Sequence, residues 1–131
     1  MKEGEVDGHI VFGSEIGFAE SNDGVAWRKH PEPVLMPGEE SAWDSQHVFY
    51  PMVLERDDQY WMYYHGNDSV INRCALGLAF SRDGLNWQRH PENPIMSLNE
   101  DRDLGLINIA CPNVVADGDG YAMIYVREKP R

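Results

Sequence analysis

The side chains that could do chemistry in this chain gather in two stretches, residues 43–50 and 64–68, which carry imidazole, amide, carboxylate and aromatic groups. Imidazole and amide groups at strand ends suit the hydroxyls of a sugar, and aromatic rings supply a flat face for stacking. The alternative is that these are ordinary half-buried polar residues. The candidate ligand-binding residues are Trp43, His47, Tyr50, Tyr64, His65, Asn67 and Asp68.

Three carboxylates are candidates for acid or base chemistry. Asp44 comes just before an apolar run, Glu15 lies between the first two predicted strands at the start of the second, and Asp103 ends the acidic segment 99–103. Each has a structural alternative, because aspartate commonly caps loops and turns and acidic runs are commonly solvated. We take Asp44, Glu15 and Asp103 as the catalytic candidates.

The composition excludes several classes of protein. The chain has 131 residues and a formal net charge of −11, which disfavours nucleic acid because phosphate binding depends on Lys and Arg. No apolar run approaches the roughly 20 residues of a membrane helix, and no secretory pattern is visible, so we expect a cytoplasmic protein with no membrane partner. Cys74 and Cys111 lack metal-ligand spacing and are expected to be reduced packing residues. We expect no metal and no cofactor.

One stretch of sequence occurs twice, at residues 21–32 and 81–92. Serine, Asp-Gly, tryptophan and His-Pro-Glu stand at the same spacing in both copies. Asp-Gly between strand-like residues predicts a hairpin with a type I′ turn, in which both central residues have positive φ. Long self-similarity of this kind predicts a repeat architecture, so Trp27 and Trp87 are expected to pack one repeat on the next.

The elements that must position these groups are all predicted to be strands. No segment has an apolar period of 3.6 over the roughly 11 residues that a helix needs. We name the four strands of one sheet a to d. Along the chain, the predicted strands then form three successive groups: b-c-d of a first sheet, a-b-c-d of a second, and a-b of a third. We therefore predict an all-β single domain of two repeats, approximately 8–70 and 71–131. The strand candidates are 8–13, 15–21, 25–29, 47–54, 59–65, 75–81, 107–116 and 120–126.

The ordered cycle of short motifs in these repeats resembles the blades of a known family. Pro-x-Val, Tyr-x-Met-x-Tyr, Gly-Leu-Ala-x-Ser and Asp-Gly-x-x-Trp follow one another from about residue 8 to 127. They resemble the blades of five-bladed β-propeller glycosidases of the arabinanase, invertase and β-mannoside phosphorylase type. A second, weaker resemblance is to the sialidase Asp box, although Asp23-Gly24 and Asp83-Gly84 lack the intervening residue of that box.

The resemblance implies a catalytic pair of carboxylates, one acting as acid and one as base or nucleophile. In the resembling enzymes an Asp or Arg-Asp usually precedes the proline of strand a, and a Glu stands in a Glu-Gly-Pro or Glu-Cys setting in a later blade. This chain has Tyr50-Pro51 and Cys111-Pro112 instead. That departure favours a non-catalytic or saccharide-binding module over a glycoside hydrolase or phosphorylase, which stays the alternative.

The chain encodes about two blades, and a closed propeller needs about four or more. Open blades leave apolar faces and strand edges uncovered. We therefore expect identical chains to form a ring as a homodimer or homotrimer, with the enzymatic alternative placing its site between subunits. The competing expectation is that the chain is a fragment of a longer propeller.

Overall fold

A computed structural model describes residues 5–6, 9–10, 12–68, 73–99 and 103–131 of the chain. These residues form strands and loops and no helix, which confirms the predicted all-β class. None of them, accordingly, lies in a helix long and apolar enough to span a membrane. The strands are β1 (Glu5–Val6), β2 (His9–Ile10), β3 (Ala19–Glu20), β4 (Arg28–Lys29), β5 (His47–Arg56), β6 (Gln59–Asn67), β7 (Cys74–Ser81), β8 (Gln88–Arg89), β9 (Asn108–Asp117) and β10 (Gly120–Glu128).

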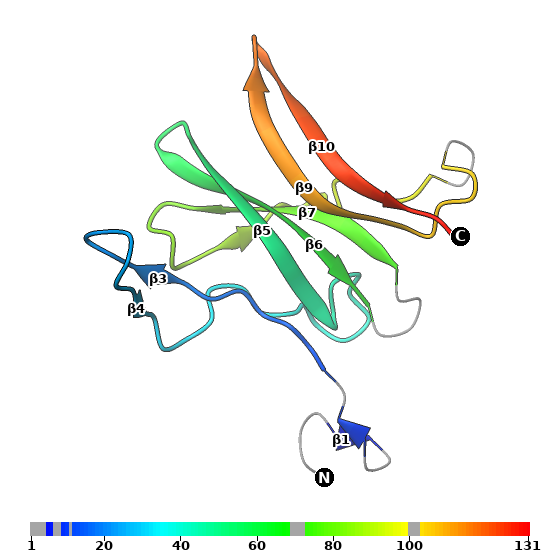
Figure 1. Ribbon diagram of the computed structural model, residues 1–131, viewed down its shortest axis with the longest axis horizontal. Coiled ribbons are helices and arrows are strands. Elements are labelled where there is room, and N and C mark those ends of the chain that lie inside the picture. Colours follow the sequence, from blue (N-terminus) through cyan, green and yellow to red (C-terminus); the bar gives the residue numbers. More distant parts are fainter. Residues whose placement is uncertain (1–4, 7–8, 11, 69–72, 100–102) are drawn as a thin grey trace.

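The centre of the molecule is one complete four-stranded antiparallel sheet in the order β5-β6-β7-β8 (Figure 1). The aromatic run predicted at 59–65 forms its second strand. Asp57 and Asp58 join β5 to β6 with φ of 52° and 61°, so this hairpin has positive φ at both turn residues. The central sheet corresponds to one whole blade, with strands a to d in chain order.

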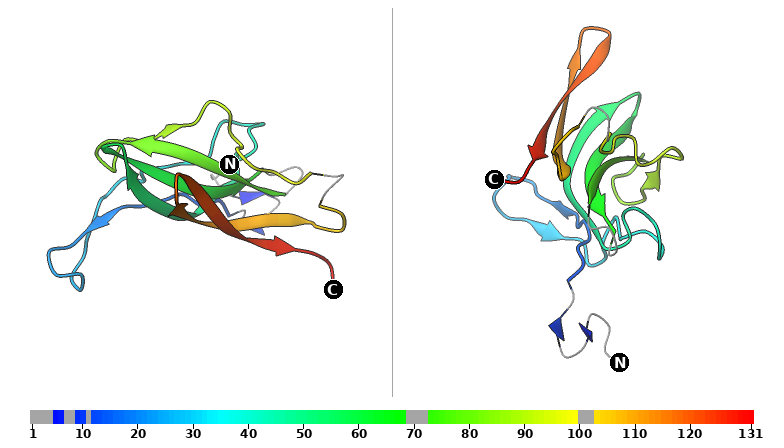
Figure 2. Two further views of the ribbon diagram at one scale, coloured as in Figure 1. Left: turned by 90° about the horizontal axis from the view of Figure 1, so that it is seen from above. Right: turned by 90° about the vertical axis from the view of Figure 1, so that its right-hand side faces the viewer.

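Two half-sheets flank the central sheet. The β3–β4 hairpin stands on one side of it, and the β9–β10 hairpin stands on the other (Figures 1 and 2). They correspond to strands c-d of a preceding blade and strands a-b of a following blade. The prediction of a b strand at 8–13 beside β3 is wrong, because β2 pairs with β1 instead. Residues 8 and 11 of that predicted strand lie outside the described part of the chain.

The repeated serine and aspartate close the loop of both hairpins by the same set of hydrogen bonds. Ser81 Oγ accepts from the backbone N–H of Gly84 at 2.8 Å, and Asp83 Oδ1 accepts from the N–H of Leu85 and Asn86 at 2.9 and 2.8 Å. The backbone bonds to Asn86 and Leu85, with the amide of Asn86, hold the pKa of Asp83 far below its usual range.

The prediction of a type I′ turn at the two Asp-Gly pairs is wrong. Gly24 and Gly84 have φ of 79°, but neither Asp23 nor Asp83 has a positive φ. The hairpin forms, and its connection is a wider side-chain-capped loop, because each aspartate accepts backbone N–H groups further along the chain and stays in the ordinary region.

The core divides between the two faces of the central sheet. Towards β3–β4 lies a cluster built on Ile16, Leu35, Val48, Met62, Tyr64 and Ala79, against which Trp43 and Trp87 pack. Towards β9–β10 lies a cluster built on Tyr63, Leu78 and Val114. Trp87 thus packs at the junction of two blades, as predicted. For Trp27 the prediction is wrong within one chain, because its side chain is 59% exposed and the blade it would meet is absent.

Candidate functional site

The candidate site is built on a bulge that occurs twice, at the residue before the proline of strand a. Tyr50 has a φ of 51° and Cys111 a φ of 54°. The register of β5 against β6 shifts between Phe49 and Met52, at the first of these bulges. A left-handed φ is strained for these residue types, and such strain persists only where the surrounding structure holds it. The bulge therefore aims Tyr50 in a direction that a regular strand would not give it.

Three rings meet at the first bulge. The His65 ring lies 3.8 Å from the ring of Phe49, edge-on, and 4.8 Å from the ring of Tyr50, measured between centroids. His65 is buried, whereas Tyr50 is 59% exposed. The exposed ring of Tyr50 therefore rests against the buried imidazole of His65.

His65 is fixed in one protonation state. Its Nδ1 accepts a hydrogen bond of 2.8 Å from the backbone N–H of Cys111, so this nitrogen carries no proton. Burial lowers the pKa of His65 to about 4. The imidazole is therefore neutral near pH 7, with its proton on Nε2.

His47 stands at the start of β5 beside the same cluster. Its ring lies 5.5 Å from that of Phe49, and Nδ1 is 2.9 Å from the hydroxyl oxygen of Ser14. The backbone of Ser14 also forms an isolated parallel β-bridge with His47 at the start of β5. The half-buried imidazole of His47 is thus oriented by the preceding blade.

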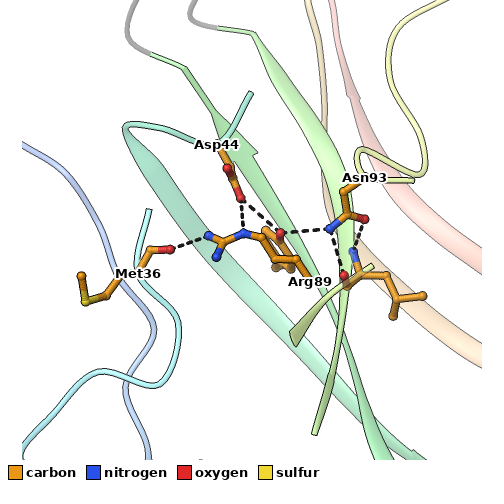
Figure 3. A network of polar contacts seen from close by, with 6 residues as sticks. Met36, Asp44, Arg89 and Asn93 are labelled. Carbon is orange, nitrogen blue, oxygen red and sulfur yellow. Dashed lines mark hydrogen bonds and ion pairs between the residues drawn. The ribbon is translucent and has the colours of Figure 1, made fainter. Parts of the chain in front are cut away.

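Asp44 lies in a buried ion pair with Arg89, and both residues line a cavity of about 430 Å³ (Figure 3). Its Oδ2 accepts from Arg89 Nε at 2.9 Å and from the Tyr64 hydroxyl at 3.2 Å. Arg89 also donates to the carbonyl of Met36, and Asn93 donates to the hydroxyl oxygen of Tyr64. The carboxylate links β6 to β8 and to the loop before β5, which is a structural arrangement. Burial, with the nearby negative charge of Asp44, raises the pKa of Tyr64 above its usual range.

Trp43 and Tyr64 pack on each other and on the backbone of β7. Their rings stack at 5.7 Å with 26° between planes. A Cβ added at Gly77 would lie 2.7 Å from Tyr64 Cζ and 2.8 Å from the Trp43 ring, so Gly77 leaves the space that these rings fill. The two rings are core residues in this structure, and the open stacking face is that of Tyr50.

The architecture matches solved structures of glycoside hydrolases. The chain superposes on a fructan 1-exohydrolase from Cichorium intybus with a TM-score of 0.66 and 23% identity, covering 86% of this chain and 21% of the other. A family 32 β-fructofuranosidase of Bombyx mori gives a TM-score of 0.65 and 22% identity, with coverage of 85% and 23%. A family 117 glycoside hydrolase of Zobellia galactanivorans gives 0.59 and 17%, with coverage of 85% and 36%.

The chain has the fold of the glycosidase β-propellers. The predicted resemblance is therefore confirmed as a fold. No family model matches the sequence. A 1,2-β-oligomannan phosphorylase of Thermoanaerobacter is 29% identical over 106 residues, which are 75% of this chain and 34% of that enzyme. An uncharacterized protein of Mycobacterium tuberculosis is 29% identical over 97 residues, 72% of this chain and 31% of that protein. The chain spans about a third of the length of these relatives.

The other predicted site residues make contacts of their own, and Asn67 lies opposite His47 in the β5–β6 ladder. Glu15 is exposed beside a cavity lined with His30 and Glu32. Asp103 Oδ2 accepts from the backbone N–H of Asn99 at 2.8 Å, as a loop cap does. Asp68 lines a cavity of about 200 Å³ with Trp43 and Arg73. Asn67 is buried at the end of β6. The catalytic role of Asp44, Glu15 and Asp103 stays a prediction.

Two parts of the propeller site were not among the predicted residues. Phe49 completes the ring cluster, and the backbone N–H of Cys111 orients His65. The signal for the second was present, because Cys111 stands in the repeat where Tyr50 stands, directly before a proline. Burial raises the pKa of the Cys111 and Cys74 thiols, which disfavours the reactive thiolate. The described residues hold no group of three metal-binding side chains.

Proposed function

We propose that this protein is a non-catalytic, saccharide-binding module of the glycosidase-propeller type. One observation carries the proposal: Tyr50 is 59% exposed, its backbone has a left-handed φ of 51°, and its ring lies 4.8 Å from the His65 ring. Backbone strain of this kind is concentrated at functional sites. An open, rigid aromatic ring suits the apolar face of a pyranose or furanose, and the nearby imidazole of His47 suits its hydroxyls.

The absence of an acid at the strand-a bulges supports binding without turnover. The resembling enzymes usually carry an aspartate before this proline, whereas the two bulges of this chain carry Tyr50 and Cys111. Asp44 lies nearby in sequence, but its carboxylate is buried and paired with Arg89. An ion-paired, buried carboxylate is poorly placed to accept a proton from water or to protonate a leaving group.

The named relatives suggest the saccharides to test first. One is a 1,2-β-oligomannan phosphorylase and another a fructan 1-exohydrolase. We therefore propose short β-1,2-linked mannose oligosaccharides as the first ligand class and short fructans as the second. The side chains of the site come from β5 and β6 of one chain, with β9 supplying the backbone bond to His65, so binding does not require a second copy.

Calorimetric titration with β-1,2-mannotriose and with a fructan trisaccharide tests this proposal. Tyr50→Ala is expected to raise the Kd of the bound saccharide about tenfold or more, because a stacking aromatic contributes roughly 1.4 kcal/mol or more to such a contact. Tyr50→Phe is the matched control, since it keeps the ring and the strained backbone, and it should bind within about twofold of wild type. Equal affinity of wild type and Tyr50→Ala, or no binding of either saccharide, would reject the proposal.

The second candidate is a carbohydrate-active enzyme, a hydrolase or phosphorylase. The 29% identity with the oligomannan phosphorylase over 106 residues favours it. Incubation of β-1,2-oligomannan with and without inorganic phosphate distinguishes the two, since release of mannose or mannose 1-phosphate would establish turnover. Asp44→Asn would then be made, with its folding checked by circular dichroism. Activity unchanged in the folded variant would exclude Asp44 as the acid.

A further inference from the structure

The two ends of the chain are complementary halves of one blade. The β3–β4 half repeats the c-d half of the central sheet bond for bond: His30 N–H donates to the Phe18 carbonyl as His90 N–H donates to the Leu78 carbonyl, at 2.8 and 2.9 Å. The β9–β10 half repeats the a-b half of the central sheet, including the bulge before the proline. The β3–β4 half lacks strands a and b, and the β9–β10 half lacks strands c and d, so each half could complete the other.

Each half also presents an unpaired strand edge. In the part of the chain that the structure describes, β3 pairs with β4 alone and β10 pairs with β9 alone. Backbone groups of an antiparallel strand alternate between its two edges. Because Phe18 bonds towards β4, the N–H and C=O groups of Gly17 and Ala19 point to the open edge. Such an edge is a template for another strand.

We propose that β10 of one copy pairs antiparallel with segment 15–21 of a second copy, so that two chains together complete a four-stranded blade. The internal β6–β7 ladder sets the register, since β6 corresponds to β10 and β7 to segment 14–21 in the repeat. There Tyr64 pairs with Gly77, Tyr63 with Leu78, and Gly66 with Ala75. The corresponding pairs between copies are Tyr125 with Gly17, Ile124 with Phe18, and Arg127 with Glu15.

The Tyr125–Gly17 pair explains why Gly17 faces empty space in the single chain. At Gly77 an added Cβ would lie 2.7 Å from the Tyr64 ring, so glycine is needed beneath that tyrosine. At Gly17 an added Cβ would meet nothing within 4 Å in the single chain. The chain nevertheless keeps a tyrosine, Tyr125, at the position that pairs with Gly17. The second copy supplies the ring that Gly17 accommodates.

The second pair fills a cavity. In the internal junction Val114 is 2% exposed and packs with Tyr63 and Leu78. At the open junction the corresponding residues are Val53 of the central sheet, which is 46% exposed, and Ile124 of β10, which is 79% exposed. Phe18 and Val53 line an open cavity of about 480 Å³ between β3 and the central sheet. Ile124 of a second copy would occupy this cavity and bury all three side chains.

The third pair is electrostatically complementary. Arg127 and Glu15 are both exposed in the single chain, and they replace the uncharged pair Gly66 and Ala75 of the internal ladder. Opposite charges facing each other across an antiparallel pair stabilise it, and like charges destabilise it. The charges therefore favour the pairing of two different ends over the pairing of two like ends.

The contact is head-to-tail, and a head-to-tail contact between identical chains closes into a ring or continues as a filament. Each chain contributes one whole blade and two halves. Two chains therefore give four blades and three give six, both within the range of about four to eight blades seen in propellers. The second copy is the occupant that the repeat register specifies. A separate protein, or further blades of a longer polypeptide, would be alternative occupants of the same edges.

Cysteine cross-linking tests the register directly. In a background with Cys74→Ser and Cys111→Ser, Phe18→Cys with Ile124→Cys places two thiols at a directly opposed pair, which is within disulfide reach. After mild oxidation we expect a closed covalent species of twice or three times the 15.0 kDa chain mass on a non-reducing gel. Phe18→Cys with Val126→Cys is the matched control, because diagonal neighbours lie about 7 Å apart, and it should cross-link at least about fivefold less. Equal cross-linking of both pairs would overturn the register.

Sedimentation equilibrium with charge variants tests whether the partner is a second copy of the chain. The wild-type chain should sediment at two or three times its monomer mass. Arg127→Glu should weaken self-association about fivefold or more, and adding Glu15→Arg to it should restore the association. A folded monomer at all concentrations would reject the second copy as occupant, and so would weakening that Glu15→Arg fails to reverse. Neither result depends on saccharide binding, so this proposal and the proposed function can fail separately.

Discussion

The backbone N–H of Cys111 donates a hydrogen bond of 2.8 Å to Nδ1 of His65, and this bond joins strand a of one blade to strand b of the blade before it. The bond needs an unprotonated Nδ1, and protonating the buried ring would break it. The support of Tyr50 by the His65 ring is thereby coupled to proton concentration.

The stability of the protein is expected to fall as the pH is lowered from 7 to 4. The pKa of His65 is about 4 in the folded chain and 6.5 in the ordinary imidazole, so the unfolded state takes up this proton first. The free energy of unfolding should therefore drop by about 3 kcal/mol across this window through this group alone. Urea unfolding at a series of pH values measures it.

Two variants isolate the contribution of His65. His65→Gln keeps a possible acceptor for the Cys111 N–H and should flatten the pH dependence between 4 and 6.5, although the variant is less stable at pH 7. His30→Gln changes an exposed histidine of the repeated turn and should keep the wild-type slope. A wild-type slope in His65→Gln would show that other groups cause the dependence.

Arg89→Met is expected to destabilise the protein by about 3 kcal/mol, because it leaves the Asp44 carboxylate buried without its partner. Lys29 is the repeat counterpart of Arg89 and is exposed, so Lys29→Met should change the unfolding free energy by less than about 0.5 kcal/mol. Thermal and urea unfolding compare the two. Similar values for both variants would mean that the Asp44–Arg89 pair contributes little.

The two tryptophans of the repeat should respond differently to truncation. Trp87 packs against the core cluster and its Nε1 donates to the Gly84 carbonyl at 2.8 Å, so Trp87→Ala should cost about 3 kcal/mol at any protein concentration. Trp27 is exposed, so the loss caused by Trp27→Ala should appear only where chains associate. Unfolding at low and high protein concentration separates them. A large, concentration-independent loss in Trp27→Ala would contradict its exposure.

Gly77, which faces the Tyr64 ring, and its repeat counterpart Gly17 form a further matched pair. Gly77→Ala forces a Cβ to 2.7 Å from the Tyr64 ring and should destabilise the fold by about 2 kcal/mol. Gly17→Ala meets open space in the single chain, so it should leave the fold intact and weaken the association of copies. Circular dichroism and sedimentation equilibrium measure the two effects. Unchanged association in Gly17→Ala would mean that Tyr125 does not lie over this position.

Local features of the fold were predictable because they depend on short-range patterns. The strongly aromatic run 59–65 predicted a strand, and the Asp-Gly pairs predicted hairpins, both of which formed. The turn type was wrong because Asp83 accepts backbone bonds from residues beyond the turn, which a two-residue pattern does not encode. The 60-residue repeat also predicted that the chain begins and ends within a blade.

The candidate site was less predictable because its contacts join distant residues. Asp44 and Arg89 lie 45 positions apart, and no local pattern marks them as partners. Trp27 and Trp87 have the same sequence context, but only Trp87 packs against the core. The difference arises because burial of each tryptophan depends on a neighbouring blade. Tyr50 and His65 were both predicted at the site, but the bulge that separates the exposed ring from the buried one has no signature beyond the following proline.

The split of one blade between the two ends of the chain has a consequence for how longer propellers could arise. If copies join through β10 and segment 15–21, a gene fusion that links them in tandem turns the intermolecular edge into an internal one and adds two blades. The fused polypeptide would then assemble independently of its concentration. Tandem fusion of this kind requires no redesigned strand pairing, because the repeat already sets the register of the new junction.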